Sequence, residues 1–440
     1  MKRIILTALI ALAALHSAFG QFIMDAQIRP RGEYLHGFST LADSVSQEGA
    51  AFFDQRTRLN FSYTHKLVKA YVSVQDIRTW GSTAQANRAD GFLNLNQAWA
   101  ETMFGKGISA KFGRQQLNYD DARIFGNLEW AQQARSHDAF LLKYEDSTLF
   151  VHVGAAYNQT NPPRFFSTNY DLAGNYKTMQ YLWAHKDFKQ KVGLSILFLN
   201  NGIQLFDTDS VGVRSNYRTA FSQTAGGRLT WDSKYLWLGG NFYYQFGKAG
   251  NDRALNAFNA LLELEVKPID KFGILVGYEV LSGTSQVQQQ TTDNYSFTPY
   301  YGTNHKFNGL MDYFYVGNHV NNVGLHNAYV QLRKKGRLFI SLDAHIFYTY
   351  ADLLDKQWLA DMNLRREVDP YLGLELDLTG RFKVNEMVSV QAGYSHMFAS
   401  KSMEVLKGGN RNALNQWAYL MITVNPVLFN SENYVKKEKK

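Results

Sequence analysis

Arginine and carboxylate side chains are concentrated in the first third of the chain, where they alternate with apolar residues. The basic members are Arg29, Arg31, Arg56, Arg58, Arg78 and Arg114, and the acidic members among them are Glu33, Asp54, Asp76 and Glu101. A guanidinium carries a permanent charge and a planar fork of donors that fits carboxylate, phosphate or sulfate. Two interpretations follow: a basic path for an anionic solute, as in anion pores, or internal ion pairs that only stiffen a wall.

Two long polar segments carry further candidate residues. Residues 118–135 contain Tyr119, Asp120, Asp121, Arg123, Gly126, Glu129, Trp130 and Arg135, and Asp138 follows them. We expect this segment to fold inward and narrow a pore, and the alternative is an ordered external loop held by its own ion pairs. Residues 283–324 combine amides with aromatic side chains such as Tyr300 and Tyr301. That combination suits either contact with sugars or packing of the loop on its own surface.

The elements that must position these side chains are short segments with a strict two-residue alternation. We count roughly eighteen of them, each near the ~9–11 residues that a membrane-spanning strand needs. In the first, residues 23–34, Ala26 and Ile28 lie on one face, and Arg29 and Arg31 lie on the other. A basic side chain facing lipid at the bilayer midplane costs about 2–4 kcal/mol. The polar faces must therefore line an interior, and an open sheet edge in lipid is excluded.

The links between these segments alternate in length along the chain. Links after even-numbered segments are short, as at residues 65–68 and 104–107, whereas links after odd-numbered segments are long, as at 35–53 and 158–175. Outer-membrane barrels have short periplasmic turns and long extracellular loops. The sequence therefore predicts an all-β protein, a transmembrane antiparallel β-barrel of about eighteen strands, formed by residues 21–429 as one domain.

Both chain ends differ from this repeating pattern. Lys2 and Arg3 precede an apolar run at residues 4–15, and Ala18 and Gly20 on either side of Phe19 are small enough for a cleavage site. We expect a signal peptide at residues 1–20, with the mature chain beginning at Gln21. Residues 430–440 form a basic tail that we place in the periplasm. The net charge of +8 includes both ends, and no basic stripe remains along the barrel, so we expect no nucleic-acid partner.

Motifs of catalysis or metal binding are not found in this chain. There is no phosphate-binding glycine loop, nucleophile elbow or zinc-binding helix motif, and the 11 His show no metal-ligand spacing. Asp343 and His345 share one strand face, and we interpret them as solvated lumen residues and not as a catalytic dyad. We therefore expect no enzymatic activity, no cofactor and no metal.

Five short motifs in order resemble the alginate export porin family. They are Arg29-Pro30-Arg31-Gly32-Glu33, Gln55-Arg56-Thr57-Arg58-Leu59, Gln75-Asp76-Ile77-Arg78, Gly113-Arg114-Gln115, and the spacing of Trp130, Arg135 and Asp138. The resemblance implies an eighteen-stranded outer-membrane barrel whose arginine-rich constriction passes an anionic polysaccharide outward. The candidate pore-lining residues are Arg29, Arg31, Glu33, Arg56, Arg58, Asp76, Arg78, Glu101, Arg114, Arg123, Arg135 and Asp138.

The leading hypothesis is a passive channel in the outer membrane of a Gram-negative bacterium, in contact with lipid, that passes anionic small solutes or acidic saccharides. A second hypothesis is a dedicated export conduit for an acidic exopolysaccharide that works with a periplasmic secretion partner. A third is an outer-membrane enzyme or adhesin that uses the barrel only as an anchor.

Overall fold

The computed structural model describes residues 20–87, 91–160, 169–170, 175–189, 191–250, 252–288, 293–314 and 323–432. The expected signal peptide, apart from Gly20, and the basic tail beyond residue 432 lie outside the described residues. Both therefore stay predictions, as does the division of the chain at residues 20 and 430.

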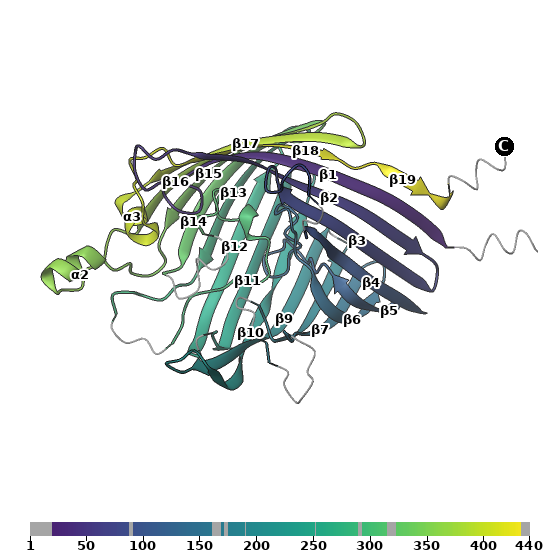
Figure 1. The fold of residues 1–440 in the computed structure, drawn as a ribbon, viewed down its shortest axis with the longest axis horizontal. Coiled ribbons are helices and arrows are strands. Elements are labelled where there is room, and N and C mark those ends of the chain that lie inside the picture. Colours follow the sequence, from purple (N-terminus) through teal and green to yellow (C-terminus); the bar gives the residue numbers. More distant parts are fainter. Residues whose placement is uncertain are drawn as a thin grey trace, which may run out of the picture.

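The described chain is a closed barrel of tilted antiparallel strands (Figure 1). Each strand pairs with its neighbours in sequence, and β1 closes the barrel by pairing with β18 and β19 as well as with β2. Because β19 follows β18 after Pro426 and continues along β1, the wall has eighteen strand positions. The strands are β1 (Gln21–His36), β2 (Ala50–Thr64), β3 (Val68–Thr79), β4 (Leu93–Gly105), β5 (Ile108–Gln115), β6 (His137–Glu145), β7 (Leu149–Tyr157), β8 (Thr178–Phe188), β9 (Val192–Thr208), β10 (Arg214–Asp232), β11 (Leu236–Lys248), β12 (Ala254–Val266), β13 (Phe272–Leu281), β14 (Leu325–Lys334), β15 (Leu338–Tyr348), β16 (Tyr371–Lys383), β17 (Val388–Ala399), β18 (Gln416–Val424) and β19 (Val427–Asn430).

The strand faces divide as the alternation predicts. On β1 the side chain of Ile28 is exposed on the outer surface, and the neighbouring Arg29 and Arg31 are buried inside. On β16 Leu378 is exposed, whereas Glu375 and Asp377 are buried. Apolar side chains on the outside can contact lipid, and every charged side chain on the inside avoids it.

The two ends of the barrel differ in the length of their links. The turns after the even-numbered strands are short throughout, and the links after most odd-numbered strands are long. This prediction is wrong at two places, residues 209–213 and 249–253, because β9, β10 and β11 extend farther and meet in short links. The helices α2 (Lys356–Met362) and α3 (Lys401–Lys407) lie at the long-link end, opposite the end where β1 begins (Figure 1).

Two of the long links fold into the barrel and form its core. We call residues 116–136 the constriction loop, and we call the described residues 282–288, 293–314 and 323–324, which include the 3-10 helix η1 (Asn304–Lys306), the second loop. Phe125 of the first and Phe297 and Tyr313 of the second are among the most buried side chains of the protein. They pack with inward residues of the wall such as Met179. The core therefore lies in the lumen. No helix among the described residues is long and apolar enough to span a membrane, which says nothing about spanning by β-strands.

Candidate functional site

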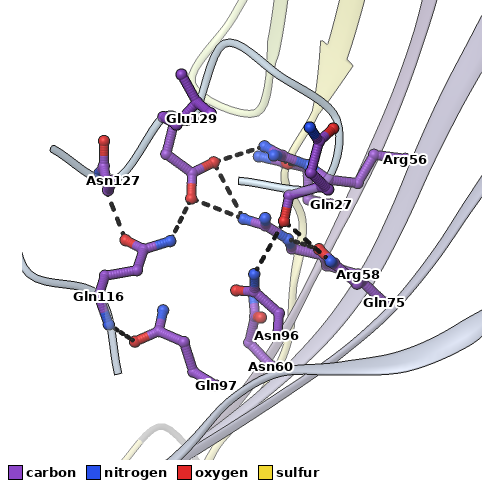
Figure 2. A network of polar contacts seen from close by, with 12 residues as sticks. Gln27, Arg56, Arg58, Asn60, Gln75, Asn96, Gln97, Gln116, Asn127 and Glu129 are labelled. Carbon is purple, nitrogen blue, oxygen red and sulfur yellow. Dashed lines mark hydrogen bonds and ion pairs between the residues drawn. The ribbon is translucent and has the colours of Figure 1, made fainter. Parts of the chain in front are cut away.

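The centre of the site is Glu129 of the constriction loop, which lies between two arginines of β2 (Figure 2). Arg56 Nη2 is 2.8 Å from Glu129 Oε2, and Arg58 Nη1 is 2.9 Å from Glu129 Oε1. Gln116 donates a hydrogen bond of 2.6 Å to the same carboxylate. Alternation places both arginines on the inner face of β2, where the loop's carboxylate can reach them.

The arginines of β1 and β2 also bind the main chain of the constriction loop. Arg29 donates to the carbonyl oxygens of Glu129, at 2.7 Å, and of Trp130 and Ala131, both at 3.2 Å. Arg56 Nη1 donates to the carbonyl oxygen of Gln132 at 3.2 Å. The loop thus presents a row of carbonyl dipoles to two buried guanidinium groups, which would be costly to bury without such partners.

Arg31 completes this set by contacts with an acid and an aromatic ring. It pairs with Glu33 at 2.7 Å and donates to the carbonyl oxygen of Trp130 at 2.9 Å. Its guanidinium carbon lies 4.5 Å from the centroid of the Trp130 ring, which also stacks on His305 at 4.7 Å. We call Arg29, Arg31, Arg56 and Arg58 the arginine ladder. Among the residues that the structure describes, Nη2 of Arg58 is the one guanidinium nitrogen of the ladder that has no hydrogen-bond partner.

Two carboxylates of the constriction loop titrate away from their ordinary range, in opposite directions. Burial acts to raise the pKa of Glu129, but the charges and hydrogen bonds of Arg56 and Arg58 outweigh it, and the net pKa is lowered. Burial raises the pKa of Asp120, against hydrogen bonds from Ser195 and Trp183 that lower it. Glu129 is therefore held as a charged group, whereas Asp120 binds a proton more readily than an exposed aspartate.

The remaining predicted site residues do not join the ladder. Arg78 pairs with Asp76 on β3, and Glu101 accepts from Lys143 at 2.9 Å near the short-turn end. Arg114 pairs with Asp138 at 3.0 Å, with side chains 42% and 60% exposed. Glu101 is buried on the inner face, whereas the strand registers place Asp76 and Arg78 on the face of the exposed Val72, and Arg114 and Asp138 on the face of the exposed Phe112 and Phe140. The role of these residues in transport stays a prediction.

Arg123 and Arg135 connect the constriction loop to other parts of the lumen. Arg123 Nη2 is 2.6 Å from Glu279 on β13, and both side chains are buried. Arg123 also donates to Asn304 at 3.2 Å, and its guanidinium lies 4.4 Å from the Phe307 ring centroid. Arg135 donates to the carbonyl oxygen of Gly302 at 2.9 Å. Both arginines therefore fix the second loop as well as the first.

The two loops pair with each other across the lumen. Gly126 donates its N–H to Tyr301 at 2.8 Å, and Thr303 donates its N–H to Ala122 at 2.9 Å. A Cβ at Gly302 would lie 2.3 Å from the carbonyl oxygen of Arg123, so only glycine permits this approach of the backbones. We call this pair of loops the partition, because it crosses the space between the two ends of the barrel.

The partition separates cavities at the two ends of the lumen. An outer cavity of about 730 Å³ at the long-link end is lined by Arg114, Arg135, Asp138 and several tyrosines including Tyr301. An inner cavity of about 450 Å³ at the short-turn end is lined by Arg228, Lys306 and Arg333 among others. A side cavity of about 280 Å³ includes Arg31, Asp54 and Arg78. The second loop contributes Tyr301 to the outer cavity and Lys306 to the inner one.

Reasoning from the sequence did not select several of these residues. The constriction loop does fold inward, as expected, but the second loop packs on it and not merely on its own surface. Asp121 of the constriction loop pairs with Arg228 of β10. Arg228 was not among the candidate residues chosen from the sequence. The expectation that His345 is solvated is wrong, because it is buried and stacks on Tyr329 at 5.0 Å. Partners more than 100 positions apart leave no local pattern that could reveal them.

Comparisons with known proteins place the chain among bacterial outer-membrane barrels. The crystal structure of Pseudomonas aeruginosa OpdO is 12% identical, with a TM-score of 0.60, covering 93% of this chain and 98% of that one. Acinetobacter baumannii OccAB1 is 13% identical, with a TM-score of 0.58, covering 92% and 97%. The structure of P. aeruginosa OpdK with vanillate is 12% identical, with a TM-score of 0.57, covering 92% and 98%. At these identities the likeness shows the fold alone.

The family to which the chain belongs is shown by a match over most of its length. No curated protein matches the chain. The model of the alginate export family matches residues 23–414, which include all strands from β2 to β17 and the whole partition. The match confirms the resemblance that the arginine motifs indicated. The chain is therefore an outer-membrane β-barrel of the alginate export family, a porin-like transport protein.

Proposed function

We propose that this protein is a passive outer-membrane channel that prefers anions and passes small anions or acidic oligosaccharides. The observation that supports this most directly is a surplus of cations in each of the three cavities. The inner cavity has five (Arg228, Lys267, Lys306, Arg333, Lys335) against four carboxylates (Asp121, Asp232, Glu263, Glu265). The outer cavity has Arg114 and Arg135 against Asp138, and the side cavity has Arg31 and Arg78 against Asp54.

A surplus of one charge in each cavity suits conduction better than a strong single site would. A permeating anion exchanges part of its hydration shell for guanidinium and ammonium donors, and nearby carboxylates keep each site weak enough for exit. Because fixed charges in a low-dielectric wall raise the local concentration of the opposite ion, the whole path favours anions.

The partition favours a narrow path over a wide diffusion pore. Its hydrogen bonds and the buried pair of Arg123 with Glu279 join the two loops and the wall. Solutes must pass beside the loops or displace them, so we expect a low conductance for a barrel of this size. Barrels of sixteen to eighteen strands without such loops leave an aqueous channel.

A second candidate function is the export of an acidic exopolysaccharide, and membership of the alginate export family favours it. An extended polymer would thread past the partition from the periplasmic side, which requires that the loops yield to it. A periplasmic secretion partner would then meet the short-turn end. Deletion of the gene in its host, followed by measurement of secreted acidic sugar, separates export from uptake of small solutes.

The first test of the proposal is the reversal potential of the purified protein in a planar bilayer under a tenfold gradient of potassium chloride. We expect the sign of an anion-preferring pore and a single-channel conductance well below that of a loop-free barrel. A cation-preferring reversal potential would overturn the proposal. A matched measurement with Arg31→Ala shows whether the side cavity contributes to the preference.

A further inference from the structure

The inner cavity is lined by charged side chains together with the aromatic rings of Trp237, Phe307 and Tyr329. Its wall is formed by the short-turn ends of β10 to β14, and its roof by η1 and Asp121 of the partition. Its volume of about 450 Å³ lies within the range of about 300–1,000 Å³ that is typical of small-molecule sites. The cavity is thus large enough to hold a ligand and not only ions.

Every carboxylate of this cavity has a basic partner. Asp121 pairs with Arg228, whose guanidinium is also 3.9 Å from Glu263. Asp232 pairs with Lys267, and Glu265 pairs with Lys335 at 2.8 Å. The negative charge of the cavity is therefore largely compensated by residues of its own wall.

Two basic side chains of the cavity are left without such a partner. Within the described part of the chain, neither Lys306 nor Arg333 forms an ion pair with a carboxylate. Lys306 is exposed, with its ammonium 4.9 Å from the Phe307 ring centroid, and Arg333 donates only to the side-chain oxygen of Gln331. Both cations remain able to bind an anionic group of a ligand, and the fork of Arg333 suits a carboxylate.

An aromatic ring lies flat on the wall beside these cations. A Cβ added to Gly239 would lie 2.3 Å from a carbon of the Trp237 ring, so the ring occupies the space above this glycine on β11. The Trp237 side chain is half-buried, and the Arg228 guanidinium is 5.9 Å from its ring centroid. A half-buried indole that lines the cavity is a surface on which a sugar ring can stack through its apolar C–H face.

From these observations we infer that the inner cavity is a binding subsite for a carboxylated sugar residue, with Lys306 and Arg333 on the carboxylate and Trp237 under the ring. The inference rests on the proposed function and assigns its selectivity to these three residues, since the arginine ladder is already bound to the constriction loop. Because the cavity lies between the partition and the short turns, a ligand reaches it from the periplasmic side.

The test measures block of single-channel current by two trisaccharides, trigalacturonate and neutral maltotriose, each added to one side of the bilayer at a time. We expect the acidic sugar to block the wild type more strongly, and from the short-turn side only. Loss of hydrogen bonds to a charged group weakens binding by about tenfold or more. The double variant K306Q/R333Q should therefore need at least about tenfold more trigalacturonate for the same block.

Two further variants distinguish charge from stacking. Trp237→Ala should weaken the block by trigalacturonate, because it removes the ring on which the sugar stacks but removes no charge. Lys271→Gln removes an exposed charge at the same end of the barrel, outside the cavity, and should leave the block within about twofold. Heat-dependent electrophoretic mobility confirms that each variant is a folded barrel.

The outcomes separate this inference from the proposed function. Block that is insensitive to K306Q/R333Q and W237A, or equal block by both trisaccharides, overturns the subsite even when the wild type prefers anions. A wild type that prefers cations overturns the proposed function itself, whatever the sugars do.

Discussion

Arginines in two sectors of this barrel face the same lumen but have different partners. In the sector of β1 and β2, the arginine ladder is buried, and its donors bind main-chain carbonyls and Glu129 of the constriction loop as well as wall residues such as Gln27 and Gln75. In the sector of β10 to β14, Arg333 and Lys306 line a cavity and form no ion pair with a carboxylate within the described chain. Both sectors carry basic side chains, but among these residues of the described chain only Arg333 and Lys306 are available to bind an anionic solute.

The difference teaches that the density of arginines along a pore wall is a poor measure of where a solute binds. The guanidinium groups of the ladder donate through every nitrogen except Nη2 of Arg58, and they must lose those bonds before they can bind an anion. Each such hydrogen bond to a charged group contributes about 1.5–3 kcal/mol. The ladder therefore acts as a scaffold for the constriction loop, and the selectivity is better sought among cations with free donors.

The largest expected effect comes from removing an arginine that holds the loops. Arg123→Ala leaves Glu279 buried without its partner, and breaking a buried ion pair in this way costs about 3–5 kcal/mol. Arg333→Ala, which breaks no ion pair, should cost less than about 1 kcal/mol. Chemical unfolding in detergent measures both values. Similar losses for the two variants would contradict the division into holding and binding arginines.

A smaller effect is expected from a single added methyl group in the partition. Gly302→Ala places a Cβ 2.3 Å from the Arg123 carbonyl oxygen, so one of the loops must shift, at a cost of about 1–3 kcal/mol. We expect a higher single-channel conductance, because the pairing between the loops weakens. Gly380→Ala is the matched control, since a Cβ there meets nothing within 4 Å. If both variants conduct alike, the partition does not limit the current.

The barrel could be predicted from the sequence because its signal is local and repeated. Alternation within each strand and the lengths of the links follow from the contrast between lipid and lumen, and each strand shows it independently. The inward position of Arg29, Arg31, Arg56 and Arg58 follows from the same alternation. The inward fold of the constriction loop was predicted from its unusual concentration of charged and aromatic residues.

The partners of those arginines could not be predicted in the same way. A main-chain carbonyl, such as that of Gln132 bonded to Arg56, has no side-chain signature in the sequence. The pairing of the second loop with the constriction loop joins residues such as Gly126 and Tyr301, which are far apart in the chain. Such contacts depend on the closed barrel, which brings distant loops into one lumen.

Acidification should loosen the constriction loop by protonating Glu129. The folded-state pKa of Glu129 is lowered, so its contribution is present above the ordinary glutamate value of about 4.3 and is lost as the pH falls below it. We expect the wild-type conductance to rise as the pH falls below about 4.3. Glu129→Gln should show the raised conductance already at neutral pH and a smaller further change on acidification. An equal acid response in both proteins would place the titrating group elsewhere.

The smallest effect is expected at the exposed pair of the outer cavity. Arg114 and Asp138 have side chains 42% and 60% exposed, so solvent screens their attraction and Arg114→Gln should change stability by no more than about 0.5 kcal/mol. The variant removes the surplus cation of the outer cavity, because Arg135 and Asp138 then balance. We expect the anion preference to fall by less than about twofold, and the change to vanish in 1 M salt, where charges more than about 3 Å apart are screened. A fall as large as that of Arg333→Gln under the same conditions would move the selectivity from the inner cavity to the outer one.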